Sequence, residues 1–191
     1  MVRRIMITVL ATLGLCVPVL ALAQTQVVEL GSSQLTTIVP EDSTEGKVFV
    51  FAVPVPQAPA GARLMSALLE LVVDASTVLP AAAPSHTVTL EIAPLAGALA
   101  EPSVEAEDLL PTTMKRSVPV GTNKPVRVDV TEFVRYVLAH PDENHGLAVG
   151  SLIGDRSGRF ELKAVGASGA LATLTLHYLP LEKASVGQPA P

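Results

Sequence analysis

The chain has 191 residues and a formal net charge of −5, with 13 lysine and arginine residues against 18 acidic ones. This balance argues against binding to nucleic acid or to anionic membrane surfaces, because both need clustered positive charge. There is no tryptophan, and 16 prolines and 13 glycines interrupt the chain. Short β-branched runs between such residues indicate an all-β fold.

The N-terminus has the pattern of an export signal. Two early arginines precede an apolar stretch over residues 5–17, and residues 21–23 (Ala-Leu-Ala) have the small-x-small form that a signal peptidase accepts. We expect a signal peptide over residues 1–23, cleavage before Gln24, and a secreted or periplasmic protein.

Two alternatives concern the same segment. Residues 5–23 are just long enough to span a bilayer, so they could remain as an uncleaved anchor. Cys16 could carry a lipid, although bulky Leu15 stands where lipoprotein signals usually have a small residue.

Cleavage would leave a chain without cysteine, because Cys16 is the single one. Neither a disulfide nor thiolate chemistry is then available, and the domain depends on its core alone. Loss of Arg3 and Arg4 reduces the 13 basic residues to 11, against 18 acidic ones, so the net charge becomes −7. The two-arginine signal and the lack of cysteine suit a bacterial export route.

Residues 24–45 are expected to form leading strands. Residues 26–30 and 34–39 have strand spacing, and an acidic turn follows them. The next segment, residues 47–53, is apolar on both faces, as a central strand of a sandwich is. A stiff connection rich in proline and alanine then covers residues 54–61.

Residues 64–74 predict a long strand, in which alternate side chains face the core. The inward residues are Ala67, Leu69, Leu71 and Val73, and the outward residues are Ser66, Glu70 and Asp74. A helix is the alternative because leucine and alanine favour helices. Val72, Val73 and Thr77 favour the strand.

A loop over residues 76–84 leads to a second alternating strand at residues 86–93. Its inward residues are Val88, Leu90 and Ile92, and its outward residues are Thr87, Thr89 and Glu91. Residues 94–111 form the longest irregular stretch, and a loop of this length is either functional or mobile. An edge strand over residues 112–120 is expected after it.

Strand spacing over residues 124–130 changes to helical spacing over residues 131–139. The strand alternates through Val126, Val128 and Val130, and the apolar stripe of the helix consists of Phe133, Val134, Val137 and Leu138. Asp129 or Thr131 is expected to cap the helix N-terminus, and Pro141 to end the helix.

The remaining segments return to strands. Strands at residues 146–153 and 159–165 flank a polar turn, a second turn follows at residues 166–169, and the last strand ends near residue 180. The inward residues are Phe160, Leu162 and Ala164 in the one strand and Ala172, Leu174, Leu176 and Tyr178 in the other. Residues 181–191 lack apolar periodicity and predict a disordered tail.

Together these segments predict a β-sandwich of two antiparallel sheets with one short helix near residues 131–139. The sandwich forms a single domain over residues 46–180, preceded by the leading strands.

Three stretches of the chain also carry a family pattern. They are residues 48–74 (VFVFAVPVPQAPAGARLMSALLELVVD), 126–151 (VRVDVTEFVRYVLAHPDENHGLAVGS) and 170–180 (ALATLTLHYLP). They resemble the opening, the Asp-Val-Thr…Asn-x-Gly-Leu core and the closing strand of DNRLRE-type domains. The resemblance implies a secreted bacterial β-sandwich of jelly-roll-like form, which in some members is similar to carbohydrate-binding modules.

The chain departs from that family at its aromatic positions. The family usually carries a tryptophan before the Asp-Val-Thr strand and another aromatic residue in the helix. This chain has no tryptophan, and Tyr136 is the nearest substitute. The difference concerns a ligand site that family members share, and it leaves the expected fold unchanged.

Acidic residues in two regions could supply oxygen ligands for Ca²⁺. The first group is Glu101, Glu105, Glu107 and Asp108, and the second is Asp142, Glu143, Asn144 and Asp155. The first group matches no calcium-loop spacing and is explained by a solvated acidic loop. The second is explained by turns, in which Asp and Asn bond to nearby amides. We predict no metal site and no cofactor.

His140 and His145 lie on either side of a short loop and could hold zinc, but no third ligand stands at a recognisable spacing. The alternative is that His140 bonds to the carbonyl groups at the helix end and that His145 is an exposed loop residue. His86 and His177 are expected within strands.

No nucleophile motif and no phosphate-binding glycine loop occurs, so we predict no catalytic residue. Paired carboxylates for glycoside cleavage could lie far apart in the chain. Such sites also need sugar-stacking aromatics, however, and the chain has four Phe and two Tyr. Tyr136, Tyr178 and the phenylalanines mostly fit core positions.

The expected function is that of an exported non-catalytic module with a structural or protein-interaction role. Its partner would be a protein of the cell envelope or of the extracellular space. The alternative is a carbohydrate-binding module that recognises an extracellular polysaccharide. We expect no nucleic-acid partner and no membrane contact beyond the signal segment.

Overall fold

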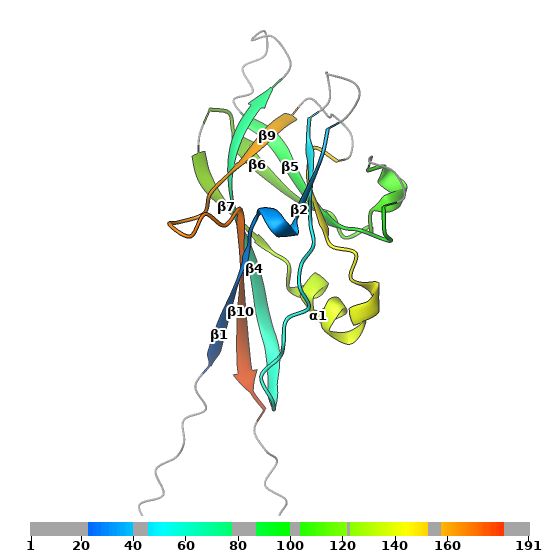
Figure 1. Ribbon diagram of the computed structural model, residues 1–191, viewed down its shortest axis with the longest axis vertical. Helices are drawn as coiled ribbons and strands as arrows, with labels where there is room; N and C mark the ends of the chain where they lie inside the picture. The colour runs from blue at the N-terminus through cyan, green and yellow to red at the C-terminus, as the bar shows by residue number, and fades with distance from the viewer. Residues whose placement is uncertain are drawn as a thin grey trace, which may run out of the picture.

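The computed structural model describes residues 23–39, 46–77, 87–99, 104–121, 123–152 and 158–181. These residues form two antiparallel sheets of five strands each, together with one short α-helix, α1 (Thr131–Ala139) (Figure 1). The predicted all-β sandwich and the bounds predicted for its helix are confirmed.

The first sheet has the strand order β1-β10-β4-β7, and β9 also pairs with β4. Its strands are β1 (Gln24–Leu30), β4 (Ala62–Thr77), β7 (Asn123–Asp129), β9 (Gly158–Lys163) and β10 (Ala172–Pro180). The long strand β4 is central: β10 and then β9 pair along one of its edges, while β7 pairs along the other.

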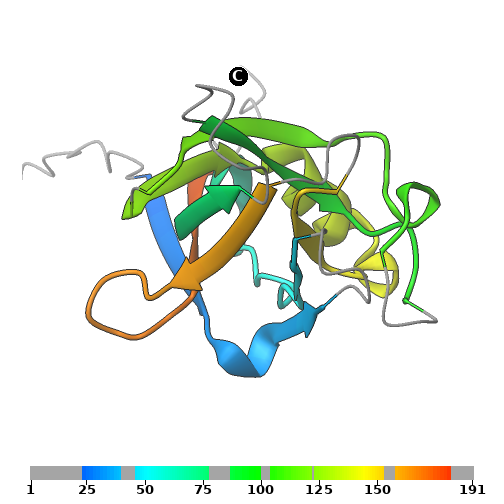
Figure 2. The same ribbon diagram turned by 90° about the horizontal axis from the view of Figure 1, so that it is seen from above.

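The second sheet has the order β2-β3-β8-β5-β6. Its strands are β2 (Leu35–Ile38), β3 (Val48–Phe51), β5 (Thr87–Pro94), β6 (Met114–Pro119) and β8 (Leu147–Gly150). The predicted edge strand is therefore β6. The chain crosses repeatedly from one sheet to the other, as in a jelly roll. The first crossing runs from β1 through the short turn η1 (Ser32–Gln34) to β2 (Figure 2).

The inner faces of the two sheets enclose the main core, and the alternation predicted for β4 and β10 is confirmed. The predicted inward residues Ala67, Leu69, Leu71, Val73, Ala172, Leu174, Leu176 and Tyr178 are all buried. Met65 forms a bulge, because Leu64 lies opposite Tyr178 while Ser66 lies opposite His177. The bulge turns Leu64 into the core as well, and pairing along both edges of β4 excludes the helical alternative.

The outer face of the second sheet carries a smaller core, and Glu91, which points outward as predicted, is buried there and not exposed. The chain after β5 folds over this face, so that Leu95, Val104 and Leu109 pack with Val48, Val50 and Ala148. Glu91 lies on this outer face and is only 2% exposed. Its Oε1 lies 2.8 Å from Lys115 Nζ, and its Oε2 accepts the Leu152 amide at 2.8 Å. The described part of the irregular stretch thus covers a sheet.

The end of β9 also departs from its predicted alternation. Phe160 is buried and Leu162 half-buried, as predicted, but Ala164 is exposed. The reason is that β9 ends at Lys163. Val165 then forms a bridge with Ala170 and takes the buried position instead.

Some predictions lie outside the described residues: the signal segment up to residue 22, the acidic turn at residues 40–45, His86, Glu101, the turn containing Asp155, and the tail from residue 182. Within the described ranges, no helix has both the length and the apolar character that a bilayer crossing requires.

Candidate functional site

The junction between β7 and α1 is held by bonds between side chains and backbone. Asp129 Oδ1 accepts the amide of Thr131 at 2.9 Å and also the Thr131 hydroxyl. Thr131 Oγ1 in turn accepts the amide of Ala67 at 2.9 Å, and the Val130 amide donates to the Ala67 carbonyl at 2.9 Å. The start of α1 is thereby fixed to β4, just beyond the last residue of β7.

The structure corrects the predicted helix cap. Val130 occupies the N-cap position, so Thr131 is the first helical residue and Asp129 precedes the cap. Asp129 instead accepts the amide two residues ahead, as Asp does in an Asx turn. The hydroxyl and the amide of Thr131 donate to the carboxylate, and they hold the pKa of Asp129 below its ordinary value of 3.8.

This lowered pKa predicts a pH-dependent contribution to stability. A carboxylate whose pKa is depressed by folding stabilises the native state above its ordinary pKa, and the contribution is lost as the pH falls through the folded-state pKa. We expect Asp129→Asn to lower the free energy of unfolding at pH 6, because asparagine keeps the acceptor oxygen but not the charge. Urea unfolding at several pH values measures this. If the difference in free energy of unfolding between Asp129→Asn and the wild type stays constant below about pH 4, the lowered pKa of Asp129 is contradicted.

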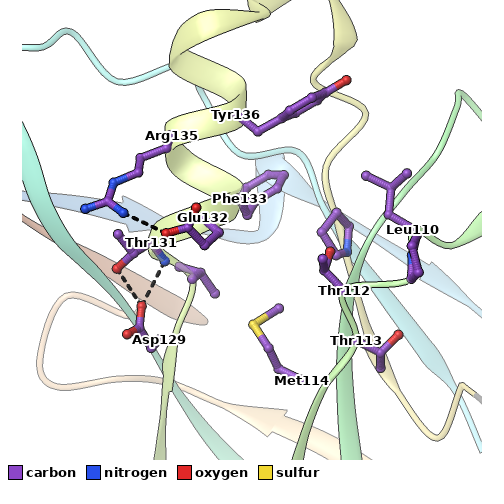
Figure 3. A pocket seen from close by; sticks show the side chains of 13 residues that line it. Leu110, Thr112, Thr113, Met114, Asp129, Thr131, Glu132, Phe133, Arg135 and Tyr136 are labelled. Carbon is purple, nitrogen blue, oxygen red and sulfur yellow. Dashed lines mark hydrogen bonds and ion pairs between the residues drawn. The ribbon is translucent and has the colours of Figure 1, made fainter.

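A groove lies beside this junction, and we call it the α1 groove. Residues 110–114, which lead into β6, form one side. Residues 129–133 with Arg135 and Tyr136 form the other, and Pro94 also lines the groove. The volume of this open groove is about 900 Å³. Figure 3 shows the two sides facing one another across Phe133 and Met114.

The α1 groove combines an apolar floor with polar walls. Phe133, Met114 and Leu110 provide the apolar surface, Thr112 and Thr113 lie on the β6 side, and Asp129, Glu132 and Arg135 lie on the helix side (Figure 3). The helix side carries two carboxylates and one guanidinium, so the groove favours a neutral or positively charged ligand.

Arg135 both belongs to the groove and anchors the helix. Its Nη1 donates to Glu132 Oε1 at 2.6 Å, and its Nη2 donates to the Met65 carbonyl at 3.2 Å. The Met65 carbonyl belongs to the bulge in β4, where a carbonyl group is left free to accept a side chain. The charged wall of the groove is therefore braced against the central strand.

Tyr136 differs from its predicted core position, because 38% of its surface is exposed. Its ring packs against His140, with 4.7 Å between the ring centroids, and its hydroxyl donates to Glu143. The hydrogen bond to Glu143, and then partial burial, raise the pKa of the Tyr136 phenol. The sequence contained the signal: position 136 lies off the apolar stripe of α1, whereas the four phenylalanines and Tyr178 are all buried.

The acidic candidates serve local structure where the structure describes them. Asp108 Oδ2 accepts the amide of Glu105 at 2.8 Å across the short turn η2 (Ala106–Asp108), and Glu143 accepts the Tyr136 hydroxyl. Asn144 Nδ2 donates to the Val53 carbonyl at 2.6 Å. Across the described ranges, no three His, Cys, Asp or Glu side chains gather as a metal site would require.

Two of the histidines, His140 and His177, lie close to a backbone carbonyl or to a strand neighbour. His140 Nδ1 lies 3.3 Å from the carbonyl oxygen of Tyr136, in agreement with the alternative that His140 bonds to the helix end. His145 is half-buried, so its expected exposure is wrong. His177 lies in β10 as expected, with its Nδ1 3.2 Å from Thr25 Oγ1 on the neighbouring strand β1.

Sequence reasoning missed the α1 groove because its sides come from separate segments. Residues 110–114 have no motif of their own, and closure of the sandwich brings them opposite residues 129–136. Comparison with known proteins adds no assignment: no protein-family model matches the chain, and no curated protein matches it.

Proposed function

We propose that the protein is an exported, non-catalytic module that binds a protein partner at the cell envelope or outside the cell. The observation that carries this proposal is the α1 groove. It offers an apolar floor beside a charged wall, the combination by which binding sites gain affinity from burial and orientation from a few polar groups.

The rigidity of the groove supports a binding role. Asp129, Thr131 and Ala67 fix the start of α1, and Arg135 braces its second turn against Met65. A surface that is held in place before binding loses less conformational entropy when a partner docks. The excess of carboxylates favours a partner segment with apolar side chains and neutral or positive charge.

Export is supported by the apolar N-terminal segment and by its small-x-small ending at Ala23. The strand β1 starts at Gln24, the first residue after the proposed cleavage position. Processing there would leave the first sheet complete.

We also propose kinship with DNRLRE-type domains. The Asp-Val-Thr and Asn-x-Gly elements that carry the resemblance have structural roles here. Asp129 and Thr131 fix the start of α1, and Asn144 ties the connection after β3 to the turn before β8. Because these roles are structural, they are compatible with a family motif in a chain whose aromatic ligand-site positions differ from the family pattern.

Thr112→Arg tests the groove as a docking site. Thr112 is exposed on the groove wall, so arginine should fill the groove without burying a charge in the core. We expect the wild-type chain to capture a discrete envelope protein from extracts of the producing cell and Thr112→Arg to lose that capture. Affinity purification with mass spectrometry measures it.

The matched control is Thr36→Arg, the same change at an exposed position of β2 in the other edge of the second sheet. Capture that Thr36→Arg abolishes as strongly as Thr112→Arg would refute the groove as the docking site. If the wild-type chain captures no protein from the extracts, the proposed function is refuted.

A carbohydrate ligand is the second candidate, and the exposed ring of Tyr136 favours it. An accessible aromatic face beside threonine hydroxyls and carboxylates suits a sugar, which presents C–H groups and hydroxyls together. A glycan array with wild type and Tyr136→Ala decides: we expect binding that Tyr136→Ala weakens. No binding at millimolar sugar would remove this candidate.

A further inference from the structure

Most edge strands of the two sheets carry features that discourage pairing with another chain. Five strands in the described part of the chain lie at sheet edges: β1, β2, β6, β7 and β9. Charged residues and prolines interrupt three of them: Lys115, Arg116 and Pro119 in β6, Lys124, Pro125 and Arg127 in β7, and Arg159, Glu161 and Lys163 in β9. The fourth, β2, has only four residues. Charge, proline and shortness are the usual protections of an edge.

The strand β1 is the least protected of the five. It runs for seven residues (QTQVVEL) with a single charged residue, Glu29, and without lysine or proline. It pairs with β10 over its full length, and no other described segment pairs with it. Alternate residues therefore direct their N–H and C=O groups away from β10. Val27 adds an apolar side chain that is 57% exposed on the outer face.

We propose that a second copy of this chain pairs its β1 with this edge, antiparallel, about a two-fold axis at Val27. In this register Val27 lies opposite Val27 of the partner subunit, and Thr25 lies opposite Glu29 of the partner subunit. The one charged residue of the strand thus meets a hydroxyl rather than a like charge.

The same register brings no like charges together on the inner face, where Gln26 lies opposite Val28 of the partner subunit.

The shape of the molecule accommodates the pairing. The strands β1, β10 and the first half of β4 extend together beyond the rest of the sandwich (Figure 1). Because the two β1 strands run antiparallel, the two sandwiches lie at opposite ends of the paired strands. The result is one continuous sheet through both copies. This interface is separate from the α1 groove, so Thr112→Arg should leave it intact.

Sedimentation velocity across a concentration series tests the proposal on the full chain. We expect a reversible dimer. Val27→Lys should raise its dissociation constant at least about tenfold, because two introduced positive charges meet at the axis. Val39→Lys, the same change at another exposed valine, should leave the dimer unaffected.

A mixing experiment distinguishes charge repulsion at this interface from misfolding of the variants. Val27→Glu alone should also dissociate the dimer, whereas an equal mixture of Val27→Lys and Val27→Glu chains should form a mixed dimer, because opposite charges then meet. A wild-type chain that stays monomeric at its highest soluble concentration overturns the proposal. So does a dimer that both Val27 variants leave unchanged, or a mixture that shows no recovery.

Discussion

Leu174→Asp is expected to unfold the protein or to lower its free energy of unfolding by at least about 3–5 kcal/mol. Leu174 is buried in the middle of β10, between Val28 of β1 and Leu69 of β4. A carboxylate there would lie in the main core without a positive partner or a hydrogen-bond donor. Either the charge is desolvated or the carboxyl group takes up a proton, and both destabilise the folded state. Urea unfolding followed by circular dichroism measures the loss.

Thr175→Asp is the matched control for this prediction. Thr175 is the next residue of β10 and lies half-buried on the outer face, opposite Val27 and Leu68. A carboxylate there keeps contact with water, so we expect a loss of at most about 1 kcal/mol, chiefly from the poor strand propensity of aspartate. Equal losses for the two variants would mean that the inward and outward faces of β10 are assigned wrongly.

Gly146→Ala is expected to cost about 3 kcal/mol or more, because two independent problems meet at this residue. Gly146 has φ of +98°, which side-chain-bearing residues rarely adopt. A Cβ atom added there would also overlap the carbonyl oxygen of Phe51. That oxygen belongs to the strand β3, which pairs with β8 immediately after Gly146, so relief of the overlap disturbs the centre of the second sheet.

Gly166→Ala separates the two causes. Gly166 has φ of +65°, but nothing lies within 4 Å of an added Cβ atom, so only the backbone conformation is penalised. We expect a loss of about 1–2 kcal/mol there. The midpoints of urea unfolding for the two variants give the comparison. A Gly146→Ala protein as stable as Gly166→Ala would show that the approach to Phe51 has no energetic consequence.

These roles of Asn144 and Gly146 give the Asn-x-Gly motif a physical meaning. Asn144 holds the Val53 carbonyl, and Gly146 permits the close approach of the turn to Phe51. The motif thus secures the end of β3 and the connection that follows it. The resemblance based on this motif therefore concerns the fold, and ligand specificity depends on other residues.

The sequence by itself determined the elements and the faces that they bury. The inward residues of β4 and β10 and the apolar stripe of α1 follow from spacing, because side chains alternate along a strand and recur every 3.6 residues along a helix. Such spacing depends only on the local backbone. It was therefore correct for Leu69 and Leu174 without any knowledge of which strands pair.

Only the tertiary structure decided what each face meets. Glu91 has the spacing of an exposed residue, yet it is buried and bonded to Lys115 and to the amide of Leu152. Tyr136 belongs to a groove because residues 110–114 lie opposite the helix, and β1 is an open edge because no described segment pairs beyond it. Burial and binding depend on contacts between segments distant in the chain, and periodicity within one segment contains no information about those contacts.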